Sequence, residues 1–113
     1  MITYLTDSNV DAMMKNNRAT YILFYEPQIP TLEDIKAVFA GFDKQLNGKV
    51  DIMFCDIGSQ KYVSEYFQMN VLPAVLFLKN GNVYGNLAGP ASASKYQDIL
   101  KDALGQLIAE QKG

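Results

Sequence analysis

The apolar residues of this chain form dense short runs, separated by stretches in which they recur every three or four positions. Three of the runs are rich in β-branched, aromatic and aliphatic residues, which favours strands. They are Thr20–Tyr25, Val50–Ile57 and Val71–Leu78. Thr20–Tyr25 is apolar on both faces, as expected of a central strand that is covered on both sides. A shorter strand is predicted from Ile2 to Leu5.

The stretches between the runs have the periodicity of amphipathic helices. A long helix is predicted from Pro30, which suits a first turn, to Gly48, which suits a C-terminal end. Its apolar stripe follows the spacing i, i+3, i+4, i+7, i+11 and consists of Ile35, Val38, Phe39, Phe42 and Leu46. This stripe predicts a helix with one buried side.

Three further helices are predicted from a capping residue and the apolar positions that follow it. Asp7–Ser8 precedes Val10, Met13 and Met14, and Ser59 precedes an inner face of Val63, Tyr66 and Phe67. Ser92 or Ser94 opens the last helix, whose inward residues are Tyr96, Ile99, Leu100, Ala103, Leu104, Leu107 and Ile108.

Asn80-Gly81 is a strong hairpin signal, so residues Asn82 to Leu87 are expected to return antiparallel to the preceding strand. The element order is then βαβαβαββα. Helices between strands favour parallel pairing with right-handed crossovers. We therefore predict an α/β fold of three α/β/α layers around a central mixed sheet, formed by a single domain over residues 1–113.

Composition and charge narrow the classes of function. The 113 residues carry a net charge of -2 and contain no cluster of Lys or Arg, which disfavours nucleic acid and anionic membranes as partners. No apolar segment has the length of a membrane span or a signal peptide, so a cytoplasmic location is expected. With one cysteine and no histidine, neither an internal disulfide nor a usual zinc site is expected, and no cofactor is predicted.

Local sequences resemble those of the thioredoxin family over nearly the whole chain. Ile2–Asp7 resembles the opening strand and helix cap of thioredoxins, and Val71–Val83 resembles the proline-led hairpin of the family. Ala88-Gly89 falls where the family has a small residue and a glycine beside the active site. The resemblance implies the thioredoxin fold. It also implies that Pro73 is the family's cis-proline, which exposes the backbone of Leu72 to an extended peptide.

The same alignment shows where this chain departs from the family. The Cys-x-x-Cys motif falls on Ile29-Pro30-Thr31-Leu32, so both cysteine positions are aliphatic. The preceding tryptophan falls on Gln28, the buried carboxylate on Leu23 and its accompanying lysine on Phe54. Thiol–disulfide exchange needs an attacking thiolate and a resolving thiol. Dithiol oxidoreductase activity is therefore excluded, and the chain is expected not to be an enzyme.

The first functional hypothesis is a non-catalytic binding module that holds a protein partner or an extended peptide on the former active-site face. Its candidate residues are Ile29, Pro30, Thr31, Leu72, Pro73, Ala88 and Gly89. Two prolines stiffen the loop Glu26–Pro30, a candidate binding loop that would present Ile29 and Leu32. The alternative is that Ile29 packs against the start of the helix and Leu32 faces the core.

Other hypotheses use other residues. Cys55 is either a single redox-active thiol or a small buried residue, and the second is favoured because no basic residue lies next to it in sequence. Glu26 and Asp56 end adjacent strands and are either a hydrolytic pair or, as favoured, solvated loop residues. Tyr62 and Tyr84 suit an exposed interface only weakly. A homo-oligomer through the edge strand or the last helix is the remaining hypothesis.

Overall fold

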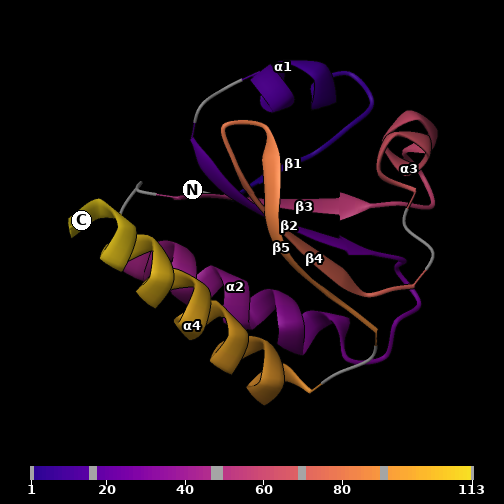
Figure 1. Ribbon diagram of the computed structural model, residues 1–113. Coiled ribbons are helices and arrows are strands. Elements are labelled where there is room, and N and C mark those ends of the chain that lie inside the picture. Colours follow the sequence, from indigo (N-terminus) through magenta and orange to yellow (C-terminus); the bar gives the residue numbers. More distant parts are fainter. Residues whose placement is uncertain (1, 16–17, 47–49, 69–70, 90–91, 113) are drawn as a thin grey trace.

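The computed structural model describes residues 2–15, 18–46, 50–68, 71–89 and 92–112 and has the predicted order of elements (Figure 1). The strands are β1 (Ile2–Tyr4), β2 (Ala19–Tyr25), β3 (Val50–Asp56), β4 (Ala74–Lys79) and β5 (Asn82–Ala88). The helices are α1 (Val10–Lys15), α2 (Leu32–Leu46), α3 (Lys61–Phe67) and α4 (Ala93–Lys112). The order βαβαβαββα and the α/β fold class are confirmed.

One mixed sheet organises the chain, with its strands in the order β1-β3-β2-β4-β5. The first three strands are parallel, whereas β4 runs antiparallel to both β2 and β5. Tyr25 pairs with Asp56, so β2 and β3 end at the same edge of the sheet. Phe24 pairs with Ala74, so β4 begins at that edge. Three chain segments therefore meet there.

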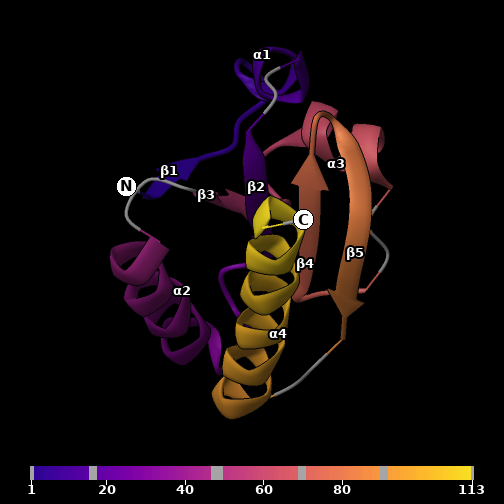
Figure 2. The same ribbon diagram turned by 60° about the vertical axis from the view of Figure 1, so that its left-hand side comes forward.

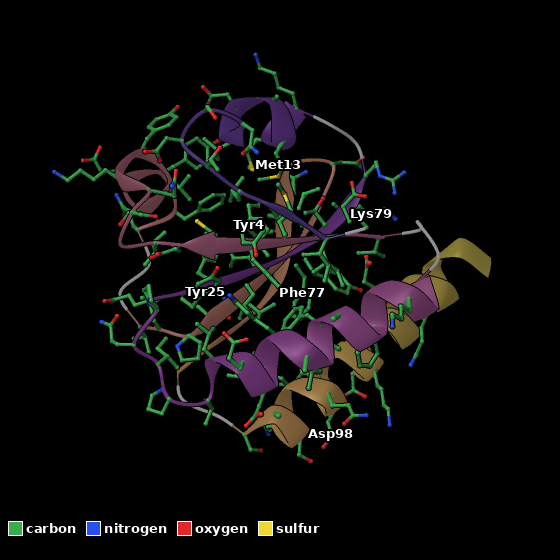
Figure 3. All side chains as sticks on the ribbon, turned by 180° about the vertical axis from the view of Figure 1, so that it is seen from behind. Tyr4, Met13, Tyr25, Phe77, Lys79 and Asp98 are labelled. Atoms are coloured by element: carbon green, nitrogen blue, oxygen red, sulfur yellow. The ribbon has the colours of Figure 1, made fainter. Side chains whose placement is uncertain are left out.

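Helices cover both faces of the sheet, as the three-layer prediction requires. Helices α2 and α4 lie side by side on one face, and α1 and α3 lie over the other (Figures 1 and 2). Along β2, Tyr21 and Leu23 face α2 and α4, whereas Ile22 and Phe24 face α1 and α3. Figure 3 shows the same division at other positions, with Met13 on the α1 side and Phe77 on the α2 side.

Strand β4 and helix α2 both begin later in the sequence than predicted, each for a local reason. Strand β4 begins at Ala74 rather than Val71, because Pro73 has no backbone N–H to offer a strand ladder. Helix α2 begins at Leu32 rather than Pro30, after a turn in which the Leu32 N–H donates to the carbonyl of Ile29 at 3.2 Å. Gly48, the predicted end of this helix, lies outside the described residues, as does the side chain of Leu46.

The predicted caps of α1 and α3 are wrong. Asp7 does not cap the helix that follows it: its Oδ1 accepts a hydrogen bond from the Val63 N–H of α3 at 2.9 Å. The Asp7 N–H donates in return to Gln60 Oε1 at 2.8 Å. Gln60, not Ser59, is the N-cap residue of α3, and its own side chain caps nothing. A carboxylate far away in the sequence therefore takes the place of a local cap.

The inner faces of α3 and α4 are partly as predicted. Val63 is buried and Phe67 packs against the core, but Tyr66 is 45% exposed because the short α3 presents only one narrow stripe to the sheet. Helix α4 is capped by Ser92, whose Oγ accepts from the Lys95 N–H at 3.2 Å. Tyr96 and Leu100 are buried as predicted. The inward residues predicted from Ala103 onward have side chains outside the described set.

Candidate functional site

A hollow of about 440 Å³ opens at the sheet edge where β2 and β3 end and β4 begins. The loop after β2, the turn after β3, helix α3 and the segment before β4 each contribute to its wall. The lining residues, which we call the groove, are Glu26, Gln28, Ile29, Ile57, Gly58, Ser64 and Leu72. The groove therefore combines three aliphatic side chains with a carboxylate, an amide and a hydroxyl.

The loop after β2 is folded by its own backbone. The Ile29 N–H donates to the carbonyl of Glu26 at 3.2 Å, and Gln28 Nε2 donates to Glu26 Oε2 at 2.7 Å. These bonds hold Ile29 where it both packs against the core of the α2 and α4 face and lines the groove. Leu32 is only 5% exposed, so its predicted place in the core is confirmed.

The opposite wall comes from the segment that enters β4. The Leu72–Pro73 peptide bond is cis, the Pro73 ring is buried and Leu72 is half-buried. The Pro73 carbonyl accepts a hydrogen bond from the Gly89 N–H at 2.9 Å, which ties this segment to the end of β5. Within the described part of the chain, no backbone hydrogen bond uses the N–H or the carbonyl of Leu72. Leu72 therefore lines the groove with a backbone that has no backbone partner among the described residues.

Gly89 adopts a backbone conformation that suits glycine, with φ of 105°. Its carbonyl accepts a hydrogen bond from the Tyr96 hydroxyl at 3.4 Å, so α4 also helps to hold this end of β5. A Cβ at position 89 would lie 3.7 Å from Cγ1 of Val71, in ordinary contact. The conformation rather than the space therefore requires glycine here.

Glu26 and Asp56 lie at the same sheet edge, but their local bonds do not resemble those of a hydrolytic pair. Asp56 Oδ1 accepts from the Gly58 N–H at 3.1 Å and shapes the turn after β3. Glu26 Oε2 accepts a hydrogen bond from Nε2 of Gln28, which lies in the same loop. Each carboxylate thus has a local partner of its own, which supports the favoured interpretation of both as loop residues.

The positions of the family's proton-transfer pair lie in an apolar interior. Leu23 is fully buried and Phe54 is 5% exposed. The Lys36 ammonium of α2 lies 4.6 Å from the centre of the Tyr25 ring and 5.6 Å from that of Phe54. Burial raises the pKa of Tyr25, and nearby Lys36 opposes that rise. The lysine here stabilises aromatic packing through cation–π contacts.

Cys55 lies within β3 and is fully buried among residues of the α1 and α3 face. Burial raises the pKa of its thiol, with the carboxylates of Asp56 and Asp7 acting in the same direction, and together they bring it to about 12. A thiol that stays protonated near neutral pH is a poor nucleophile. The prediction of a small buried residue on a central strand is confirmed.

The structure separates the seven predicted site residues into three groups. Ile29 and Leu72 both line the groove. Pro73 and Gly89 support it through their shared backbone bond. Pro30 and Thr31 are exposed beside the groove without lining it, and Ala88 pairs with Ala74 in the sheet, its side chain outside the described set.

Sequence reasoning missed three lining residues: Ile57, Gly58 and Ser64. Glu26 and Gln28 belong to the loop that was considered for binding, but neither was named among the candidate site residues. The signal for Ile57 and Gly58 was available, because residues that follow parallel strands gather at one edge of the sheet. No sequence signal placed Ser64, since its position depends on how α3 packs.

The fold and the groove together define a thioredoxin-like protein that has no dithiol. The family model described as Thioredoxin matches residues 1–102, so the chain belongs to the thioredoxin family. A solved structure described as "Crystal structure of a designed protein" is similar to it, with a TM-score of 0.78 and 20% sequence identity. The match covers 94% of this chain and 90% of that chain, and it shows the fold alone. One cysteine in the whole sequence means that a Cys-x-x-Cys motif is absent.

Two kinds of feature are absent from the residues that the structure describes. Across these ranges, no helix combines the length and the apolar character needed to cross a bilayer. In the same part of the chain, no group of three or more His, Cys, Asp or Glu side chains is arranged to hold a metal ion.

Proposed function

We propose that this chain is a non-catalytic binding module of the thioredoxin family, which holds an extended segment of a protein partner in the groove. The observation that carries the proposal is the backbone of Leu72, whose N–H and carbonyl have no backbone partner among the described residues. An extended chain can pair with such groups by adding a short strand, and side-chain pockets then give selectivity. Ile29 lies across the groove and offers an apolar contact to the same segment.

The lack of redox chemistry is part of the same proposal. Ile29 and Leu32 occupy the dithiol positions, and Cys55 is buried with a raised pKa. A single-thiol sensor would need an accessible thiolate. Labelling of the native protein by a small thiol reagent at neutral pH should therefore be slower than labelling of the denatured protein by more than about a hundredfold. Equal rates would favour the single-thiol hypothesis.

Partner capture tests the groove directly. The immobilised chain is incubated with an extract of its source cells, and the retained proteins are quantified by mass spectrometry. We expect Ile29→Asp to lower the recovery of the retained proteins by about tenfold, because it places a charge in an apolar contact. Val83→Asp is the matched control, since Val83 is 52% exposed on β5 and does not line the groove.

A second variant guards against a loss of folding in Ile29→Asp. Ser64→Tyr fills the groove from α3 without altering the packing of Ile29, and it should weaken capture to a similar degree. Circular dichroism verifies the fold of each variant. If both groove variants retain the same proteins as the wild type, the binding face lies elsewhere.

A cytoplasmic location belongs to this proposal, supported by a fold that forms without an internal disulfide. The homo-oligomer hypothesis stays a prediction, and a measured mass in solution decides it.

A further inference from the structure

We propose that the groove selects segments that place a basic side chain next to an aliphatic one, an inference that rests on the proposed function and specifies its ligand. The three aliphatic lining residues, Ile29, Ile57 and Leu72, suit an aliphatic side chain. The polar lining residues are Glu26, Gln28 and Ser64, and these decide which second side chain is accepted.

The polar side of the groove is rich in hydrogen-bond acceptors. The side-chain amide of Gln28 donates through Nε2 to Glu26 Oε2. This bond uses neither the Oε1 atom of Gln28 nor the Oε1 atom of Glu26, so both can accept from another donor. The Ser64 hydroxyl has no side-chain partner among the described residues. Glu26, Gln28 and Ser64 thus bring three side-chain oxygens to one groove, which suits a group with several N–H donors, such as a guanidinium or an ammonium.

The charged residues around the groove also favour a basic side chain in the ligand. Glu26 is the one charged residue among the described lining residues. Asp56 lies next to the lining residue Gly58, and its Oδ1 would be 3.4 Å from a Cβ added to that glycine. The lysine of the neighbouring helix α2, Lys36, is held over the Tyr25 and Phe54 rings. Lys61 is exposed at the start of α3. One carboxylate therefore lines the groove and a second lies beside it, which favours a cationic side chain over an anionic one.

Two synthetic peptides test this selectivity: acetyl-Ala-Leu-Lys-Val-Ala-amide, and the same peptide with Glu in place of Lys. Each is titrated into the ¹⁵N-labelled full chain, and binding is followed by the amide signals of Gly58, Ser64 and Leu72. We expect the Lys peptide to bind about two- to fivefold more tightly than the Glu peptide, as one half-exposed ion pair allows. An Arg peptide should bind at least as tightly as the Lys peptide, because its fork reaches two acceptors.

Glu26→Gln should abolish the preference for Lys while keeping the binding of both peptides. Asp102→Asn is the matched control: Asp102 is exposed on α4, away from the groove, and the change removes the same unit of charge. It should leave the preference intact. A preference that falls equally in both variants reflects net charge and overturns the inference.

The remaining outcomes separate the two proposals. Equal binding of both peptides, with shifts at the groove, overturns the charge selectivity and leaves the binding function standing. Binding of neither peptide, with no shift at any of the three amides, contradicts this inference. If partner capture also survives the Ile29→Asp substitution, both this inference and the proposed function are wrong.

Discussion

Among the glycines that the structure describes, Gly81 at the tip of the β4–β5 hairpin has the least room for a side chain. A Cβ there would lie 2.7 Å from the carbonyl oxygen of Met14, because the hairpin turn packs against α1. Asn80 and Gly81 have φ of 56° and 76°, the left-handed pair that a tight two-residue turn needs. The Asn-Gly signal in the sequence predicted the turn. Its contact with Met14 could not be predicted, because that contact joins segments far apart in the chain.

Gly81→Ala should lower the free energy of unfolding by about 1–3 kcal/mol, since it combines a strained φ with a clash against backbone. Urea denaturation measures the change. Gly41→Ala in α2 is the control, because a Cβ there meets nothing within 4 Å. That substitution should raise stability by about 0.5–1 kcal/mol. A Gly81→Ala protein as stable as the wild type would show that the turn can shift away from α1.

At the scale of elements, hydrophobic patterning predicted the helices and the central strands, because each of them buries a stripe or a face, whereas β5 was predicted from the Asn80-Gly81 turn. Their caps were predicted less well. Ser92 caps α4 from the adjacent residue and was found from sequence. Helix α3 is capped by Asp7, which no local pattern could indicate. Ser64, on the same helix, was missed as a groove residue for the same reason: the placement of α3 is a tertiary property.

Asp7→Ala should destabilise the protein by about 0.5–2 kcal/mol, the usual effect of removing a helix cap. Hydrogen exchange should show the largest loss of protection in α3 rather than in α1. Ser8→Ala is the matched control, since the Ser8 hydroxyl is exposed and bonds only to Thr6 Oγ1 among the described residues. It should change stability by less than about 0.5 kcal/mol. Protection lost mainly in α1 would contradict the assignment of this cap.

At the scale of the whole molecule, several ionisable side chains are buried in their neutral forms on both sides of the sheet. Burial raises the pKa of Tyr25 and Tyr96 above the ordinary 10.0, and that of Cys55 to about 12. The unfolded chain keeps the ordinary values, 9.0 for the thiol. Their contribution to stability is therefore complete below pH 9.0 and is lost as the pH rises through the folded pKa values.

The Cys55→Ala variant should lose less stability than the wild type as the pH rises above 9.0. Between pH 9.0 and about 12, the wild type should lose up to about 1.4 kcal/mol per pH unit more than the variant, because the unfolded thiol releases a proton that the folded one retains. Urea denaturation at a series of pH values gives both curves, each compared with its own value at neutral pH. Parallel curves would mean that the thiol titrates alike in the folded and unfolded chains.

Asp7 donates its backbone N–H to Gln60 Oε1 and accepts from the Val63 N–H, so its two partners lie 53 and 56 residues away in the sequence. A change at position 7 is constrained, since loss of the carboxylate leaves the Val63 N–H in the first turn of α3 without its acceptor. Relatives that lack an acid at position 7 should therefore carry Ser, Thr, Asp or Asn at position 60, where a local side chain can take over. The two positions should vary together in descent, as a pair that selection maintains jointly.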